Sequence, residues 1–340
     1  MIKYPKPLQE GDTIAVTAPS SGVEEELHWL LHQAKKHAEE MSFNIVIGDT
    51  VWTERKARST SKEERAEELM NFLLDDQVDV VMPPWGGEFL MQLLPLLNWD
   101  KLKHARPKWI LGFSDISTLT FAFTLHTGIA TAHGTNFFDL SLKKMDALTS
   151  RWREVLGLED GEALTQRSSH LYQSSWEKVF ENPGEQFVLD TPTEWKTTGG
   201  HSVSFEGRLI GGCANTLNII AGTKHAPFEL FQSQVEEGLV WYLEWVEWSA
   251  SDALRALWKF KELGWFENTN GVLIGRPIGG GNTKDFTYEE AIHEVFEEVN
   301  IPVIYDVDIG HMPPQMTLIN GAFTEVEAAE GKGSVTIKRV

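Results

Sequence analysis

The first 133 residues alternate short apolar runs with amphipathic helical stretches, and this pattern limits the fold more than any other feature of the chain. The strand-like runs lie at residues 11–18, 43–47, 78–82, 109–111 and 129–133. Apolar residues recur at helical spacing at residues 24–41, 63–74 and 88–97, and again after residue 116. The sequence therefore predicts an α/β N-terminal domain with a doubly wound parallel sheet, whose ligands bind beyond the carboxyl ends of its strands.

The second half of the chain has a mixed pattern. Strand-like runs at 207–210, 239–243, 271–274 and 302–305 are separated by helical segments at 213–221, 251–263 and 288–299, with a turn expected at Gly211-Gly212. Residues 318–337 alternate as antiparallel strands do. Periodicity is weak from about 140 to 206, apart from a helix near 145–156. We expect an N-terminal domain over 1–165, a linker or substrate-covering loop over 166–206, and a smaller mixed C-terminal domain over 207–340.

Composition excludes several classes of function. The 340 residues carry a net charge of −20, which repels phosphate backbones, so we expect no long nucleic acid as a partner. No run approaches the roughly 20 apolar residues that cross a bilayer, and the N-terminus lacks the apolar core of a signal peptide. We expect a cytoplasmic protein with no membrane partner. The single cysteine, Cys213, excludes an internal disulfide and a cysteine-based zinc site, and no H-E-x-x-H occurs. We expect no metal and no cofactor.

Ser114 lies between a predicted strand and a predicted helix. The segment KWILGFSDISTL at 108–119 passes from an apolar run through Gly112 to Ser114 and then to helical spacing. A serine in such a turn presents its hydroxyl at the edge of the sheet, and the unpaired amides of the first helical turn can stabilise an oxyanion. The alternative is that Ser114 only caps the helix, because the second glycine of a G-x-S-x-G elbow is absent.

A nucleophilic serine needs a base and an acid that orients it. Of the 11 histidines, His133 and His311 follow short strands and stand beside glycines, which suits a site. Glu244 ends an apolar strand, where a carboxylate is costly unless it is paired. The alternative for Glu244 is a strand-end residue that reaches solvent.

Six short motifs, in this order and spacing, resemble the LD-carboxypeptidase family of serine peptidases. They are Trp85-Gly86-Gly87, Gly112 to Asp115, His133-Gly134, Gly211-Gly212 with Asn215-Thr216-Leu217, Tyr242-Leu243-Glu244 and Gly310-His311. Each motif alone is unspecific, but the ordered set covers nearly the whole chain.

The resemblance implies roles for individual residues. Ser114 would be the nucleophile, His311 the base and Glu244 the acid that orients it, and no metal would take part. Glu247 is a second acid nearby, but an acid at the strand terminus fits the family pattern better.

The resemblance also implies an oxyanion hole and an architecture. The backbone amides of Gly87 and Asp115 would form the hole. The N-terminal domain would be flavodoxin-like and the C-terminal domain smaller and β-rich, with the site in the cleft between them, and homodimers are common in the family.

Two branches of the family cut different bonds. Murein-tetrapeptide carboxypeptidases release a terminal D-alanine, whereas relatives of the microcin C immunity protein cut the amide or acyl-sulfamoyl link between an amino acid and a nucleotide-like group. The insertion between about 140 and 206, which carries Trp176 and Trp195, resembles the second branch. We therefore expect a small peptide or aminoacyl-nucleotide substrate, bound by Trp85, Gly86, Trp176 and Trp195. Stacking of an aromatic ring on a base contributes about 1–3 kcal/mol. The alternative is that Trp176 and Trp195 anchor the loop to the rest of the protein.

A binding protein without catalysis is the alternative from another class. Two domains with a cleft between them also suit a small-ligand-binding protein, in which Ser114 would be inert toward an acylating probe. The run Gly279-Gly280-Gly281-Asn282 lacks the Lys and Ser/Thr of a phosphate-binding loop and is more typical of a turn.

Overall fold

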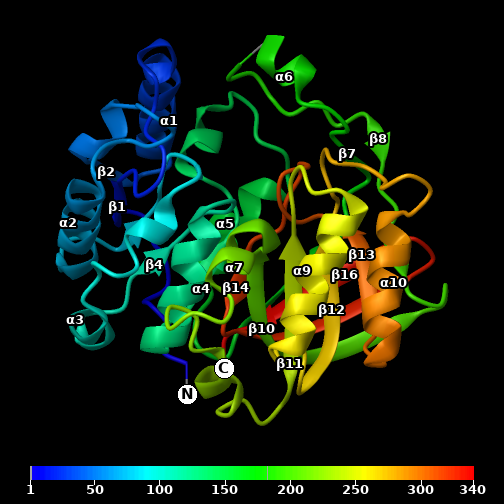
Figure 1. Cartoon of the computed structure of the whole chain (residues 1–340). Helices are drawn as coiled ribbons and strands as arrows, with labels where there is room; N and C mark the ends of the chain where they lie inside the picture. Colours follow the sequence, from blue (N-terminus) through cyan, green and yellow to red (C-terminus); the bar gives the residue numbers. More distant parts are fainter. Residues whose placement is uncertain (1, 182) are drawn as a thin grey trace.

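The computed structural model describes residues 2–181 and 183–340, and each half of the chain is built on its own sheet (Figure 1). In the N-terminal half, four parallel strands lie in the order β2-β1-β3-β4. Their bounds are β1 Thr13–Val16, β2 Asn44–Ile47, β3 Val80–Val81 and β4 Trp109–Ile110. The helices are α1 His28–Glu40, α2 Lys62–Leu74, α3 Trp99–His104, α4 Ile116–Thr127 and α5 Trp152–Leu156. The predicted parallel sheet with helices is confirmed.

The C-terminal half contains a mixed sheet of eight strands, in the order β6-β16-β15-β10-β11-β12-β13-β9. The neighbours from β10 to β13 are parallel, and the outer pairs are antiparallel. The strands are β6 Ala163–Arg167, β9 Lys196–Thr197, β10 Val203–Cys213, β11 Leu239–Glu244, β12 Thr269–Gly275, β13 Val303–Val307, β15 Phe323–Ala329 and β16 Lys332–Lys338. The helices are α7 Ala214–Ile220, α8 Phe228–Gln232, α9 Ala250–Glu262 and α10 Tyr288–Glu298. The predicted mixed α/β character of this half is confirmed.

The insertion contains short elements of its own. The strands β7 Leu171–Tyr172 and β8 Thr191–Pro192 pair with each other, and α6 Glu177–Glu181 lies between them in sequence. This segment runs over the top of the molecule in the view of Figure 1. It therefore covers the region in which the two halves meet.

Helix α4 joins the two halves. Every residue of α4 except His126 is buried, and the helix packs against β10 as well as against β5, Thr131–His133, which pairs with β14, Leu318–Asn320. Phe121 of α4 stacks on Phe228 and lies beside Trp241, both from the C-terminal half. The helix that follows Ser114 is thus part of a core that both halves share.

Two sequence predictions are wrong at this level. The segment 88–97 contains only a 3₁₀ turn, Leu90–Gln92, because Pro95 interrupts the run. The Leu90 amide donates to the Asp115 carboxylate at 2.9 Å. The Gly211-Gly212 pair is not a turn but the end of β10. A Cβ on Gly212 would lie 2.7 Å from the Cβ of Ser117, so glycine permits the close approach of α4.

No helix within the described residues is long and apolar enough to cross a bilayer.

Candidate active site

Ser114 lies at the sharp turn between β4 and α4. Its φ of 62° places it in the left-handed region, which a serine rarely adopts. The N-cap of α4 is Asp115, and the Ser114 side chain makes no hydrogen bond within the described residues, so Ser114 does not cap the helix. A Cβ on Gly86 would lie 2.7 Å from the Ser114 Oγ. Glycine at that position therefore lets the chain pass directly beside the hydroxyl.

The amides of Gly87 and Asp115 flank this turn, and neither donates a hydrogen bond to any acceptor in the described part of the chain. The Asp115 carboxylate is buried and accepts from the Ser20 hydroxyl at 2.5 Å and from the Leu90 amide. Burial raises the pKa of this carboxyl. The side chain of Asp115 thus fixes the loops that follow β1 and β3 against α4, while its amide is left free for a ligand.

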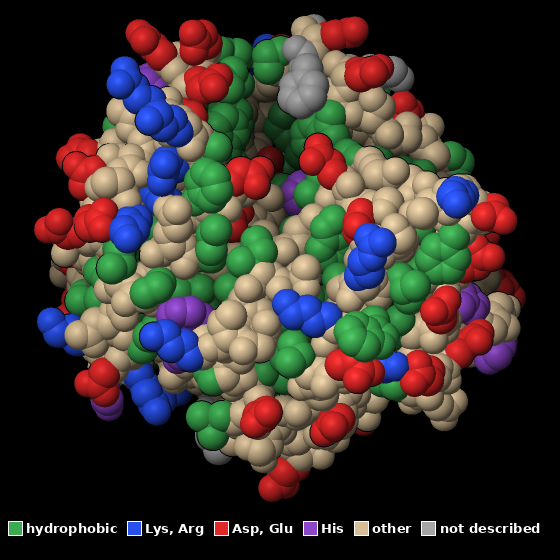
Figure 2. Space-filling view, in the orientation of Figure 1, with side chains coloured by type: hydrophobic (Ala, Val, Ile, Leu, Met, Phe, Trp, Pro, Cys, Tyr) green, Lys and Arg blue, Asp and Glu red, His purple; other side chains and the backbone are tan. Residues whose placement is uncertain are grey.

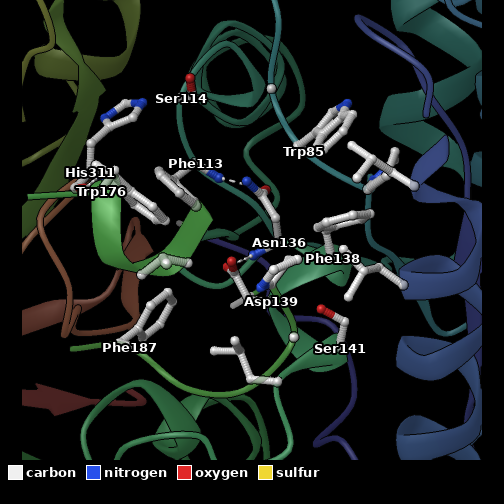
Figure 3. A pocket seen from close by; sticks show the side chains of 18 of the residues that line it. Trp85, Phe113, Ser114, Asn136, Phe138, Asp139, Ser141, Trp176, Phe187 and His311 are labelled. Atoms are coloured by element: carbon white, nitrogen blue, oxygen red, sulfur yellow. Dashed lines mark hydrogen bonds between the residues drawn. The ribbon is translucent and has the colours of Figure 1, made fainter. Parts of the chain in front are cut away.

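Glu244 and His311 come from the C-terminal half and form a hydrogen-bonded pair. The distance from Glu244 Oε2 to His311 Nδ1 is 2.7 Å, and Glu244, at the end of β11, is fully buried. The alternative that Glu244 reaches solvent is therefore wrong. Burial opposes charge on both groups, but their mutual attraction outweighs it, so the pKa of His311 is raised and that of Glu244 is lowered. His311 lies beside Ser114 in the cavity (Figure 3).

A buried network holds the turn that carries His311. Arg276 and Asp308 are both buried and form an ion pair at 2.5 Å, and the Trp195 indole donates to the same carboxylate at 2.9 Å. The Trp176 indole donates to the His311 carbonyl at 3.0 Å. Two tryptophans of the insertion thus contact the segment 308–311 directly.

Trp195 does not line the cavity. It is 2% exposed and belongs to a buried hydrophobic cluster, and its indole nitrogen donates to Asp308. The expectation that Trp195 binds substrate is therefore not supported by its position, and the alternative, that it anchors the loop, fits. Trp176 lines the cavity, and it also holds the insertion in place by donating a hydrogen bond to the His311 carbonyl.

The cavity beside Ser114 has a volume of about 510 Å³ and largely apolar walls. Figure 2 shows it as a hollow with hydrophobic side chains inside, near the top of the view. In Figure 3, Trp176 and Phe187 lie on the side of His311, and Trp85 and Phe138 lie opposite. A second hollow of about 430 Å³ shares Trp85 and Gly86 with the first and continues toward Glu24 and Glu54. A ligand at Ser114 therefore has room on two sides.

Acidic groups dominate the charge of the cavity. Its charged lining residues, among the side chains that the structure describes, are Asp139, Glu247 and His311, with no lysine or arginine. Burial raises the pKa of Asp139 to about 6. Glu247 is exposed at the rim and is not the partner of His311. Sequence reasoning missed Asp139 and Phe187, because neither lies in a motif or follows a strand.

His133, the other histidine that the sequence singled out, is fully buried beneath the site. Its Nδ1 lies 3.4 Å from the Ser117 hydroxyl, and burial lowers its pKa to about 4. Because burial lowers its pKa, His133 is neutral at neutral pH, and it does not line the cavity. No group of metal-ligating side chains occurs among the described residues.

Family models match both halves of the chain. Residues 14–134 match the model of the LD-carboxypeptidase N-terminal domain, and residues 206–326 match that of the LD-carboxypeptidase C-terminal domain. The chain belongs to the LD-carboxypeptidase family. It is thus an enzyme of the serine carboxypeptidase type. Relatives of this chain occur in both branches of the family.

Three curated relatives span nearly the whole chain. A putative carboxypeptidase of Vibrio cholerae is 26% identical and covers 92% of this chain and 91% of its own. The murein tetrapeptide carboxypeptidase of Pseudomonas aeruginosa is 27% identical, with 88% and 87% covered. The microcin C7 self-immunity protein MccF of Escherichia coli is 24% identical, with 97% and 94% covered. Identity at this level does not separate the branches.

Solved structures share the fold over almost the full length. An MccF-like protein from Bacillus anthracis superposes with a TM-score of 0.83 at 23% identity, and 99% of each chain is covered. MccF in complex with aspartyl sulfamoyl adenosine gives a TM-score of 0.82 at 22% identity, again with 99% of each chain covered. These likenesses establish the fold of this chain.

Proposed function

We propose that this LD-carboxypeptidase family member cleaves the bond between an aminoacyl group and a nucleotide-like group, with Ser114, His311 and Glu244 as its triad. His311 Nε2 takes the proton of the Ser114 hydroxyl, and the oxygen attacks the acyl carbonyl. Glu244 holds Nδ1 and stabilises the imidazolium that forms. The imidazolium then returns its proton to the leaving group as the carbonyl carbon separates from it.

The oxyanion and the acyl-enzyme follow from the same geometry. The free amides of Gly87 and Asp115 would donate to the carbonyl oxygen as its charge develops, a contribution of about 3–4 kcal/mol for each such donor in comparable sites. Water, deprotonated by His311, then attacks the ester on Ser114 and releases the free amino acid. Each step uses only groups of the chain and one water molecule.

The observation that carries this proposal is the aromatic, cation-free cavity beside Ser114. Aromatic walls at Trp85, Phe138, Trp176 and Phe187 suit a nucleobase, which stacks on such rings. A carboxypeptidase must bind the free carboxylate at the end of its substrate, which calls for a lysine, an arginine or several donors. The described lining offers carboxylates instead. MccF, which has the same fold, binds aspartyl sulfamoyl adenosine.

Release of D-alanine from a murein tetrapeptide is the second candidate. It is favoured by the relative from Pseudomonas aeruginosa, whose identity to this chain is no lower than that of MccF. The arrangement of Ser114, His311 and Glu244 serves both reactions equally well. The two candidates differ only in what fills the cavity.

The deciding experiment is mass spectrometry of products from a leucyl-sulfamoyl adenosine and an L,D-tetrapeptide, incubated in parallel with the purified protein. We expect cleavage of the nucleoside conjugate alone. The Ser114→Ala variant should lose it, while Ser233→Ala, at an exposed serine remote from the cavity, should retain it. Release of D-alanine alone would transfer the protein to the murein branch.

A third outcome concerns the class of protein. If neither substrate is cut and a fluorophosphonate probe does not label Ser114, the result would support a binding protein without catalysis. Labelling that is lost in Ser114→Ala but retained in Ser233→Ala would establish a reactive serine even before a substrate is found.

A further inference from the structure

The charge around His311 is strongly one-sided. Three carboxylates, those of Glu244, Asp139 and Glu247, act electrostatically on this imidazole, and no lysine or arginine stands among the described lining residues. Glu244 is accounted for by its hydrogen bond to His311. The other two carboxylates have no such partner in the cavity.

Asp139 is the group that most needs explanation. It lies in the 3₁₀ helix Phe137–Ser141, and its Oδ2 accepts only from the Asn136 amide, at 2.9 Å. Its Oδ1 accepts no hydrogen bond within the described residues. The residue is mostly buried and lines the cavity. A carboxylate in such apolar surroundings is costly unless a positive charge meets it.

The backbone fixes Asp139 relative to the reacting centre. The side-chain oxygen of Asn136 accepts from the Phe113 amide at 3.2 Å, directly before Ser114, and the Asn136 amide donates to Asp139. Figure 3 shows Asn136 and Asp139 side by side on the floor of the cavity, between the aromatic walls. Asp139 and Ser114 thus line one cavity, and an acyl side chain that reaches Asp139 leaves the base to Trp85 and the second hollow, which shares Trp85 and Gly86 with the first.

We propose that Asp139 binds the positively charged side chain of the substrate's acyl residue, so that the enzyme prefers lysyl or similar basic aminoacyl groups. This inference rests on the proposed function, because it names the class of acyl group that this activity takes. Glu247 adds a second negative charge at the rim. A basic aminoacyl group carries two positive charges, on its α-ammonium and on its side chain, and the two carboxylates can meet both.

Other roles for Asp139 predict different effects of its replacement by asparagine. A carboxylate that only supports the local backbone would keep its capping contact with Asn136 when replaced by asparagine, whose oxygen accepts equally well. A carboxylate that acts only on His311 would change the rates of all substrates in the same proportion. Selection of a cation alone changes the ratio between a charged substrate and its uncharged isostere.

The test compares kcat/KM for lysyl-, norleucyl- and glutamyl-sulfamoyl adenosine. Norleucine has the carbon chain of lysine without the ammonium. We expect the lysyl conjugate to exceed the norleucyl conjugate at least tenfold, and the glutamyl conjugate to be the poorest. Asp139→Asn should reduce the lysyl-to-norleucyl ratio at least tenfold, and Glu247→Gln, at the exposed rim, severalfold.

A matched control removes the same charge elsewhere. Asp285→Asn neutralises an exposed carboxylate that does not line the cavity, and we expect it to leave the ratio unchanged. An Asp139→Asn variant with an unaltered ratio, or with all three substrates slowed equally, would overturn the inference.

Binding to the Ser114→Ala variant separates this inference from the proposed function. Calorimetry measures the affinity of the lysyl and norleucyl conjugates without any turnover. Tighter binding of the lysyl conjugate, combined with no cleavage by the unmodified enzyme, would overturn the proposed function and keep the charge preference. Cleavage of all conjugates with equal affinity would do the reverse.

Discussion

Two carboxylates act on the same histidine, the fully buried Glu244 and the partly buried Asp139, and only the first has a partner for its charge within the described residues. Glu244 is paired with His311 at 2.7 Å, and its pKa is lowered in spite of burial. Asp139 has one amide donor and no ion-pair partner among the described residues, and burial raises its pKa to about 6. The fold supplies a partner for the charge of the first carboxylate. The second carries a cost that the folded chain does not offset, which is the mark of a group held for a ligand.

The largest expected effect comes from breaking the pair of Glu244 and His311. Glu244→Gln should lower kcat/KM by about 10³–10⁴-fold, as happens when the acid of a serine triad loses its charge. Glu244 raises the pKa of His311, so its loss lowers that pKa. The base then stays neutral to lower pH, and the acidic limb of the pH–rate profile should shift downward. A limb that stays in place would show that Glu244 does not set the pKa of the base.

A second paired carboxylate, Asp308, extends the comparison to stability. Arg276→Met leaves Asp308 buried and without its cation, and should reduce the free energy of unfolding by about 3–5 kcal/mol. Urea unfolding followed by tryptophan fluorescence measures the loss. The double variant Arg276→Met/Asp308→Asn should recover part of it, because the unpaired charge is gone. No recovery would mean that packing of the Arg276 side chain, and not its charge, matters.

Removing the charge of Asp139 should raise the free energy of unfolding, whereas removing Arg276 should lower it. The folded-state pKa of Asp139 is above its unfolded value, so the folded protein binds the proton more tightly and loses stability as the pH rises from about 4 to 6. Asp139→Asn should therefore stabilise the protein at pH 8 by about 1–3 kcal/mol and much less at pH 4. Thermal unfolding at the two pH values checks this. A variant less stable at pH 8 would contradict the cost assigned to this carboxylate.

The smallest effect concerns the hydrogen bond that Trp176 donates to the His311 carbonyl. Trp176→Phe removes the donor and keeps an aromatic wall, so we expect kcat to fall about three- to tenfold, which corresponds to about 1 kcal/mol. Trp258→Phe, at an exposed tryptophan outside the cavity, is the matched control. An unchanged kcat with a raised KM would assign Trp176 to substrate contact alone.

Much of the fold could be predicted because its signals are local. Each N-terminal strand is a short apolar run that ends at a turn, and the period of the intervening helices is visible in the sequence. The helix predicted over 88–97 was wrong because Pro95 interrupts the apolar run and removes a backbone donor, which the spacing of apolar residues does not reveal. The turn predicted at Gly211-Gly212 was wrong because the neighbours that require these glycines, the Tyr242 backbone of β11 for Gly211 and Ser117 of α4 for Gly212, meet them only through tertiary packing.

The residues of the candidate site also differ in how far the sequence indicates them. Ser114, Glu244 and His311 each follow a strand or stand beside a glycine, so the pattern and the family resemblance both indicate them. Asp139 lies in a run, NFFDL, with no periodicity and no motif. Its importance arises from a cavity built by the insertion and both halves. Arg276 and Asp308 each follow an apolar strand, as Glu244 does, and that signal could have pointed to their pairing.

Helix α4 has a consequence for how the chain gains its structure. Because nearly every face of α4 is buried, and because its neighbours include β5 from the N-terminal half and β10 from the C-terminal half, neither half can complete its own interior without the other. The two family models divide the sequence into two parts, but the parts are not independent folding units. We therefore expect one cooperative unfolding transition for the whole chain, and no stable protein from either half expressed alone.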